Sequence, residues 1–222
     1  MVARSLAQIQ QEFLVAASAA GALKFGEFTL KSGRLSPYFF NAGMFCSGKT
    51  LSALSGAYAD RLIASDIQFD MLFGPAYKGI ALSAATAEQL YLRHSLDVGF
   101  CYNRKEAKDH GEGGLLVGAK LAGRVVIVDD VISAGTSVRE SVQIIRAAGA
   151  TPVAVLIALD RAERGSDIAS RLSAAGEVSA QFQIPVLAVA SLNDLLRYVE
   201  TDSSLVNNRD ALLAYQAQFG AN

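Results

Sequence analysis

The chain has 222 residues, of which 51% are hydrophobic, and its formal net charge at pH 7 is −1. This length and composition fit one folded domain with a sizeable core and exclude a largely disordered chain. The near-zero net charge gives no reason to expect a general nucleic-acid-binding face.

Cysteine usage and the N-terminal residues bear on where the protein works. Cys46 and Cys101 lie far apart and form no CxxC pair, so neither a disulfide framework nor a zinc site is indicated. Polar residues such as Gln8 and Glu12 interrupt what would be the apolar segment of a signal peptide. The longest weakly polar stretch, 14–23, is too short to span a bilayer. We therefore expect a cytoplasmic protein without a membrane partner.

The elements are predicted in chain order from hydrophobic periodicity. Helical spacing predicts an amphipathic helix from Ser5 to about Ala20, and the Gly- and aromatic-rich segment 26–46 predicts short strands and turns. A helix follows at about 48–65. Strands are predicted at 70–74, 97–102, 124–129, 153–159 and 182–188, separated mostly by helices at 79–93, 136–148 and 166–175, with two short helices at about 191–199 and 206–217.

Apolar strands alternating with helices predict an α/β fold with a central, mostly parallel sheet covered by helices on both faces. Segment 103–123 departs from this alternation, because it has no helical apolar stripe and contains several glycines. We predict a mobile loop there, at about 103–114. The sequence shows no internal repeat or linker, so residues 1–222 are expected to form a single domain.

The stretch 125–137, VVIVDDVISAGTS, combines two carboxylates with a loop of small residues. Ligands bind at the carboxyl ends of parallel strands, where Asp129 and Asp130 are expected to lie. The loop opens a helix and suits a phosphate, with Ser133, Thr136 and Ser137 as added donors. Two acids can accept hydrogen bonds from a diol and help to hold Mg²⁺, so a ribose 5-phosphate meets both demands. The alternative is that these acids merely cap the helix.

This stretch resembles the 5-phosphoribosyl 1-pyrophosphate (PRPP) motif of the type I phosphoribosyltransferases. The resemblance implies that family's fold, with a small N-terminal hood at about 1–46 and a flexible catalytic loop. It also implies that the acids contact the ribose hydroxyls, that the loop binds the 5-phosphate, and that Mg²⁺ is held mainly through PRPP with the acids nearby. The implied PRPP-binding residues of this stretch are Asp129, Asp130, Val131, Ile132, Ser133, Ala134, Gly135, Thr136 and Ser137.

Four further stretches, from about 26 to 165, resemble the orotate phosphoribosyltransferases. In 28–41 the resemblance assigns Lys31 to pyrophosphate and both Phe39 and Phe40 to the orotate site, to which Ser133 is also assigned. Neighbouring strand residues face opposite ways, so at least one of the two phenylalanines should belong to the core.

The second stretch, 73–80, places Tyr77 and Lys78 in a loop that binds pyrophosphate in the resembled family. The alternative for Lys78 is a solvated lysine, which the helix dipole disfavours at a helix start.

The third stretch, 102–114, matches the family's catalytic loop. A solvated charged loop is the alternative that composition alone would favour. The resemblance instead implies that the loop closes over PRPP in the neighbouring subunit's site, and hence a homodimer. The implied loop residues are Arg104, Lys105, Lys108 and His110.

The fourth stretch, 158–165, contains Arg161, which the resemblance assigns to orotate. A guanidinium can grip the orotate carboxylate with two parallel hydrogen bonds. The alternative is an ordinary ion pair with Glu163 or Asp160.

Taken together, the resemblance implies transfer of the 5-phosphoribosyl group from PRPP to N1 of orotate, giving orotidine 5′-monophosphate and pyrophosphate in UMP biosynthesis. The alternatives are transfer to another base, or a PRPP-binding regulator that contacts nucleic acid. A chain of 222 residues leaves no room for an added decarboxylase barrel of ~250 residues. The implied catalytic residues are Arg104, Lys108, His110, Asp129 and Asp130.

Overall fold

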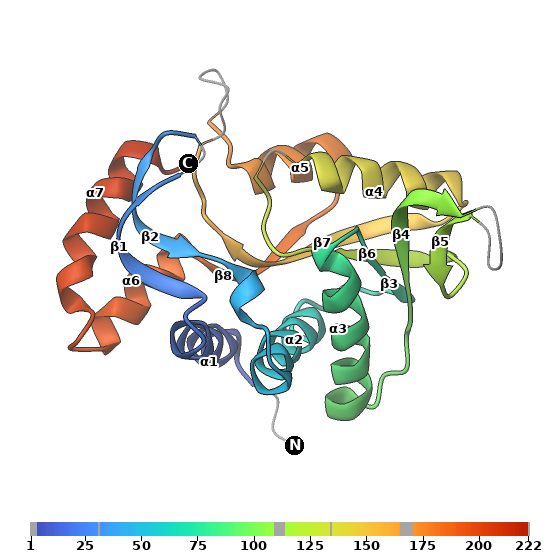
Figure 1. Ribbon diagram of the computed structural model, residues 1–222, viewed down its shortest axis with the longest axis horizontal. Helices are drawn as coiled ribbons and strands as arrows, with labels where there is room; N and C mark the ends of the chain where they lie inside the picture. Colours follow the sequence, from blue (N-terminus) through green and yellow to red (C-terminus); the bar gives the residue numbers. More distant parts are fainter. Residues whose placement is uncertain (1–3, 31, 109–113, 134, 165–170, 222) are drawn as a thin grey trace.

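The computed structural model describes residues 4–30, 32–108, 114–133, 135–164 and 171–221, without the side chains of 107, 108 and 114. Its centre is a six-stranded sheet with strand order β5-β4-β3-β6-β7-β8 (Figure 1). All strand pairs are parallel except β4 with β5. The strands are β3 (Met71–Gly74), β4 (Gly99–Lys108), β5 (Gly114–Gly118), β6 (Arg124–Val128), β7 (Thr151–Asp160) and β8 (Val186–Ser191).

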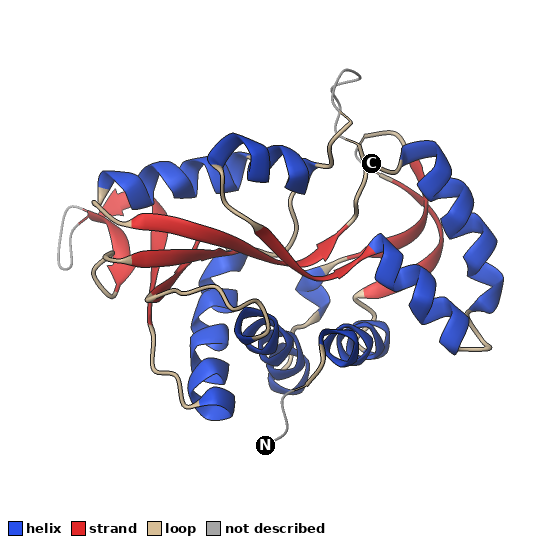
Figure 2. Cartoon of the chain, turned by 180° about the vertical axis from the view of Figure 1, so that it is seen from behind, coloured by secondary structure: helices blue, strands red, loops and turns tan. Residues whose placement is uncertain are grey.

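Helices cover both faces of this sheet, which confirms the predicted α/β class (Figures 1 and 2). Helices α1, α2 and α3 lie on one face, α4 and α5 lie on the other, and α6 and α7 lie at the β8 side of the molecule. The helices are α1 (Leu6–Ala19), α2 (Gly48–Ile63), α3 (Lys78–His94), α4 (Thr136–Ala147), α5 (Ala174–Phe182), α6 (Leu192–Thr201) and α7 (Arg209–Phe219).

Alternation along β6 shows why this strand is apolar throughout. Val126 and Val128 belong to the core beneath α1, α2 and α3, whereas Val125 and Ile127 belong to the core beneath α4 and α5. Since successive side chains point to opposite faces, a central strand must be apolar at every position. The strand then ends directly at the two acids.

A separate two-stranded antiparallel sheet, β1 (Leu23–Thr29) with β2 (Leu35–Phe40), forms the N-terminal part together with α1. It lies beside α6 and α7 (Figure 1). A short 3-10 helix, Ala42–Met44, leads from β2 toward α2. The expected strands and turns of 26–46 are therefore present.

Three parts of the sequence-based assignment were wrong. The segment after residue 102 is not without regular structure, because β4 runs on to Lys108 and pairs with β5 as a hairpin. The predicted strand 182–188 begins too early: Phe182 ends α5 and Gln183 adopts a left-handed conformation, so β8 starts at Val186. Helix α5 starts at Ala174, later than predicted, and residues 165–170 lie outside the described part of the chain.

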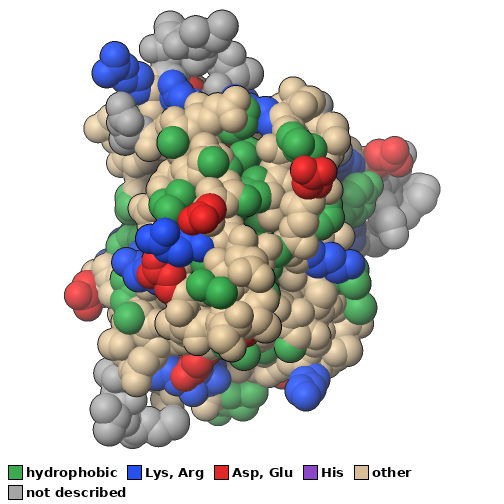
Figure 3. Space-filling model, turned by 90° about the vertical axis from the view of Figure 1, so that its left-hand side faces the viewer, with side chains coloured by type: hydrophobic (Ala, Val, Ile, Leu, Met, Phe, Trp, Pro, Cys, Tyr) green, Lys and Arg blue, Asp and Glu red, His purple; other side chains and the backbone are tan. Residues whose placement is uncertain are grey.

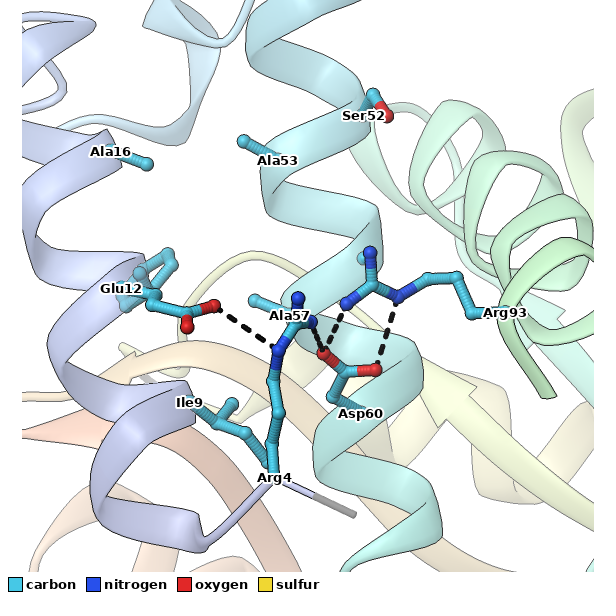
Figure 4. A pocket seen from close by; sticks show the side chains of 11 residues that line it. Arg4, Ile9, Glu12, Ala16, Ser52, Ala53, Ala57, Asp60 and Arg93 are labelled. Atoms are coloured by element: carbon cyan, nitrogen blue, oxygen red, sulfur yellow. Dashed lines mark hydrogen bonds and ion pairs between the residues drawn. The ribbon is translucent and has the colours of Figure 1, made fainter. Parts of the chain in front are cut away.

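A buried carboxylate joins three helices on the α1–α3 face. Asp60 on α2 accepts hydrogen bonds from Arg4 (2.7 Å), from Arg93 Nε (3.1 Å) and from His94 (2.8 Å). Figure 4 shows Arg4 and Arg93 converging on Asp60 from either side, at a cavity of about 140 Å³. The cluster therefore ties the start of α1 and the end of α3 to α2.

The surface around α6 and α7 carries basic and acidic side chains that are intermixed, with apolar side chains scattered between them (Figure 3). Among the described residues, no helix is both long enough and apolar enough to cross a membrane.

We expect Asp60→Asn to lower the free energy of unfolding by about 2 kcal/mol. Removing one partner of a fully buried pair costs about 3 to 5 kcal/mol, and the cost is smaller here because water reaches both arginines. Urea unfolding measures the change. The matched control is Asp70→Asn, because Asp70 pairs with Arg124 while both side chains are nearly half exposed. Equal losses for the two variants would contradict the role given to Asp60.

Candidate active site

The site lies where the strand order reverses. The chain passes from β3 outward to β4 and then returns to β6 on the other side of β3, so the carboxyl ends of β3 and β6 flank a topological switch point. Such a point leaves a crevice in an open parallel sheet. Lys78, at the start of α3, forms an ion pair there with Asp130, which follows β6. The Lys78 ammonium is thus not merely solvated.

Two glycines let α3 begin this close to the strands. A Cβ on Gly74 would lie 2.0 Å from the Gly79 carbonyl oxygen, and one on Gly79 would lie 2.8 Å from the Val128 carbonyl oxygen. Real side chains do not tolerate such distances, so any larger residue would push α3 away from β3 and β6. The glycines therefore place Lys78 within reach of Asp130.

Asp129 differs from Asp130 in its partners. One carboxylate oxygen of Asp129 accepts from the backbone N–H of Asp130 (2.9 Å), and the other accepts from the Ser137 hydroxyl (2.9 Å). The Tyr58 hydroxyl, fully buried on α2, donates to the Asp129 carbonyl (2.8 Å). Asp129 thus fastens the loop after β6 to the start of α4, while Asp130 faces the lysine.

Burial raises the pKa of the Asp129 carboxyl to about 6, and the neighbouring Asp130 charge adds to this rise. The N–H of Asp130, the Ser137 hydroxyl and the Lys78 charge oppose it. The acid is therefore harder to ionise than an ordinary aspartate, because a buried negative charge is poorly solvated.

The loop between the acids and α4 surrounds a cavity of about 100 Å³, lined among others by Val131, Ile132, Ser133, Thr136 and Ser137. Gly135 caps α4 in the left-handed conformation (φ +69°), which glycine adopts without strain. The cavity therefore opens at a helix N-terminus, where backbone N–H groups favour an anion. Of the expected phosphate-binding residues, Ala134 lies outside the described part of the chain.

The β4–β5 hairpin approaches the same crevice. Asn103 accepts a hydrogen bond from the backbone N–H of Ala76 (3.0 Å), and the Lys105 ammonium lies 5.2 Å from the centre of the exposed Tyr77 ring. Arg104, which lies between Asn103 and Lys105 in the sequence, is partly buried. The side chain of Lys108, and His110 altogether, lie outside what the structure describes, so their positions stay predictions.

The phenylalanine pair on β2 divides as its strand position predicts. Phe40 packs against Phe13 of α1, with ring centres 6.2 Å apart, whereas Phe39 is 40% exposed and contacts Phe28. Phe39 is therefore the more exposed of the two and the better candidate for a stacking surface. Lys31 lies outside the described residues.

Arg161 follows β7 at the same edge of the sheet as the acids. Its Nε donates to Glu163 (2.6 Å), its Nη2 donates to Ser36 (3.1 Å), and its guanidinium lies 4.4 Å from the centre of the Tyr38 ring. The ion pair with Glu163 that the sequence left open is thus present, whereas Asp160 accepts from the Ala162 N–H instead. The N–H groups of Nη1 and the second N–H of Nη2 are the donors that a bound carboxylate can use.

Sequence analysis missed the residues that hold these groups in place. Ser36 and Tyr38 lie within the stretch 28–41, next to Phe39, so their place in the sequence could have indicated a role at this site. Tyr58 on α2 carries no such signal, because a buried tyrosine in a helix is ordinary core until its partner is known.

The oxygen donors at the crevice decide how a metal ion could bind there. Within the described ranges, no group of three or more His, Cys, Asp or Glu side chains could together hold a metal ion. The nearest oxygen donors at the crevice are the two acids. Because both oxygens of Asp129 already accept hydrogen bonds, Asp130 is the better placed of the two for a cation carried by a ligand.

Residues 47–174 match the family model described as phosphoribosyl transferase domain. The chain is 58% identical over 217 residues to an orotate phosphoribosyltransferase of Herminiimonas arsenicoxydans, covering 96% of this chain and 98% of the relative. It is 60% identical over 204 residues to that of Bordetella avium, covering 90% and 93%. A crystal structure of orotate phosphoribosyltransferase from Francisella tularensis superposes with a TM-score of 0.83 at 41% identity, covering 94% and 98%.

The raised pKa of Asp129 predicts how the free energy of unfolding changes with pH. Because this pKa lies above its ordinary value of 3.8, folding favours the protonated acid. The resulting stability is complete below the ordinary value and is lost as pH rises through about 6. The Asp129→Asn variant stays neutral, so its stability relative to the original chain should grow by about 2 kcal/mol between pH 4 and pH 8.

Urea unfolding at several pH values measures this difference. The control is Asp210→Asn, at a side chain that is 96% exposed, for which the difference should stay constant. A constant difference for Asp129→Asn as well would refute the raised pKa.

Proposed function

The chain belongs to the orotate phosphoribosyltransferase family, and we propose how its residues carry out that family's reaction. The reaction transfers the 5-phosphoribosyl group of PRPP to N1 of orotate, a step of pyrimidine biosynthesis. The bond from the anomeric carbon to pyrophosphate breaks, its electron pair leaves with pyrophosphate, and a bond to N1 forms. The observation that carries the residue assignment is the pairing of Lys78 with Asp130 across the switch point.

Asp130 accepts hydrogen bonds from the ribose hydroxyls. Its carboxylate pairs with Lys78 at the crevice, and the Lys78 side chain is 56% exposed, so a ligand can reach this pair. The 5-phosphate enters the cavity of the small-residue loop, where N–H groups at the start of α4 and the hydroxyls of Ser133, Thr136 and Ser137 donate to it. Asp129 keeps this loop in shape.

The pyrophosphate end meets positive charge. Lys78 moves from Asp130 to the leaving group, because a phosphate carries more negative charge than one carboxylate. Tyr77 approaches the same place from the loop before α3, and we assign Lys31 to it as well. Arg104, Lys105, Lys108 and His110 are assigned to it from the hairpin of the neighbouring subunit. Cations fixed before the reaction stabilise the charge that grows on pyrophosphate in the transition state.

Mg²⁺ is assigned to the PRPP complex. This ion keeps several waters and binds through one or two carboxylates together with substrate phosphates, rather than through a cage of side chains. This mode of binding fits the crevice, because Asp130 can contribute one carboxylate while both oxygens of Asp129 already accept hydrogen bonds from the loop. Bound there, Mg²⁺ neutralises phosphate charge.

Orotate stacks on Phe39 and meets Arg161 with its carboxylate, and Ser133 is assigned to the same end of the site. The exposed face of Phe39 supports the stacking, and base–aromatic stacking is worth about 1 to 3 kcal/mol in other systems. Arg161 supports selection, because uracil and the purines lack the carboxylate.

We also propose a homodimer in which residues 103–114 reach the neighbouring subunit's site. The β4–β5 hairpin stands at the edge of the sheet, where a partner can meet it (Figure 1). The protein is assigned to the cytoplasm, in keeping with its two separate free cysteines.

The first test follows loss of orotate absorbance in the near ultraviolet with purified protein, PRPP and Mg²⁺. We expect loss that depends on PRPP and on Mg²⁺. Uracil, hypoxanthine and adenine are assayed alongside by product separation, and we expect no turnover of any of them. Turnover of another base in place of orotate would remove the role assigned to Arg161.

Replacing Lys78 with Met should lower kcat about 100-fold, because one preorganised cation no longer stabilises pyrophosphate. The KM for orotate should stay unchanged. Steady-state kinetics separates the two constants. Lys49→Met provides the control, because Lys49 is also an exposed lysine in the first turn of a helix. The assignment fails if the two variants behave alike.

Mixing two inactive variants tests the shared site. Lys108→Ala removes a loop residue and Arg161→Ala removes a base-site residue. If the loop crosses to the partner, mixed dimers contain one intact site, and an equal mixture should regain about a quarter of the original activity. No recovery, with subunit exchange shown by mass spectrometry, would place the loop in its own subunit's site.

A further inference from the structure

The C-terminal helix supports the arginine assigned to orotate. The Arg161 guanidinium lies over the Tyr38 ring, and Tyr38 in turn meets the Tyr215 ring of α7 edge-on, with ring centres 6.2 Å apart. Tyr215 packs against Phe219, one turn further along α7. Both tyrosines are buried, at 0% and 4% exposure. The rings thus form a continuous layer behind Arg161.

The end of α7 also holds the segment that follows Arg161. The Arg164 N–H donates to the Phe219 carbonyl (2.9 Å), and the Ala221 N–H donates to the Ala162 carbonyl (2.7 Å). Arg34 of the β1–β2 connection lies over the Phe219 ring and pairs with Glu163. Residues 162–164 are therefore fixed from both sides.

Two buried hydroxyls in this layer lack hydrogen-bond partners. Within the described part of the chain, the buried side-chain polar atoms without a partner are the hydroxyls of Tyr38, Thr86 and Tyr215. An unpaired buried hydroxyl costs about 1 to 3 kcal/mol, so its retention calls for an explanation. Burial raises the pKa of Tyr215, Glu163 raises it further and Arg161 opposes this, so both groups act on a hydroxyl that makes no hydrogen bond of normal geometry.

We propose that Tyr215 is a positioning residue for Arg161 and thereby a determinant of the preference for a carboxylated base. The proposal rests on the proposed function, in which Arg161 binds the orotate carboxylate. When the orotate carboxylate binds to the Arg161 guanidinium, the ion pair between Arg161 and Glu163 is weakened. The Tyr215 hydroxyl then donates to Glu163, which keeps Glu163 hydrogen-bonded and holds Arg161 at the angle that the base requires.

Tyr215→Phe tests the proposal, because it removes the hydroxyl and leaves the ring. We expect the KM for orotate to rise about 5- to 10-fold, the loss of one hydrogen bond to a charged group. The kcat and the KM for PRPP should stay unchanged. The melting temperature should be unchanged or slightly higher, because the variant lacks the unpaired buried hydroxyl. Affinity for uracil as an inhibitor should not change, because it has no carboxylate.

The control is Tyr198→Phe, at a tyrosine of α6 that is 5% exposed. It should leave every constant unchanged. An unchanged KM for orotate in Tyr215→Phe, or an equal rise in the KM for PRPP, would overturn the proposal.

Arg161→Gln separates this failure from a failure of the proposed function. If Arg161→Gln raises the KM for orotate but Tyr215→Phe does not, Arg161 binds the base without help from α7. If neither variant changes it, the role of Arg161 in the proposed function is wrong.

Discussion

The ion pair between Lys78 and Asp130 spans the one place where the strand order of the sheet reverses. It can form only because Gly74 and Gly79 let α3 begin against the ends of β3 and β6. With a larger residue at either glycine, the helix start and the acids would move apart. The small-residue loop after β6 and the start of the β4–β5 hairpin adjoin this contact, so the two glycines fix how α3 meets this edge of the sheet.

The two adjacent acids solve a problem that neither could solve alone. Asp129 holds the loop after β6 by accepting hydrogen bonds from Ser137 and from the N–H of Asp130. In the proposed function, this leaves the N–H groups at the start of α4 for the 5-phosphate. Asp130 is thereby left to pair with Lys78. Because burial raises the pKa of Asp129, its carboxyl carries less negative charge than an ordinary aspartate beside the loop to which the proposed function assigns the 5-phosphate.

The sequence predicted the sheet, most helices and the loop after β6, because periodicity and a long motif are local signals. It also predicted that Phe39 and Phe40 would face opposite ways. It missed the β4–β5 hairpin, because the second half of β4 is polar and is held by pairing with β5 rather than by an apolar stripe. It missed Tyr58 and Tyr215 because their partners are distant in sequence, and only the folded chain brings helix and loop together.

The most direct test of the central claim is the dissociation constant of PRPP, measured by calorimetry for Lys78→Met, Asp130→Asn and the double variant. If both residues form one PRPP site, each single change raises the dissociation constant at least 10-fold. The fold-change of the double variant then differs from the product of the two single fold-changes, because the residues are in contact. Unchanged affinity in either single variant, or strict additivity, would contradict the claim that the switch point between β3 and β6 is the PRPP site.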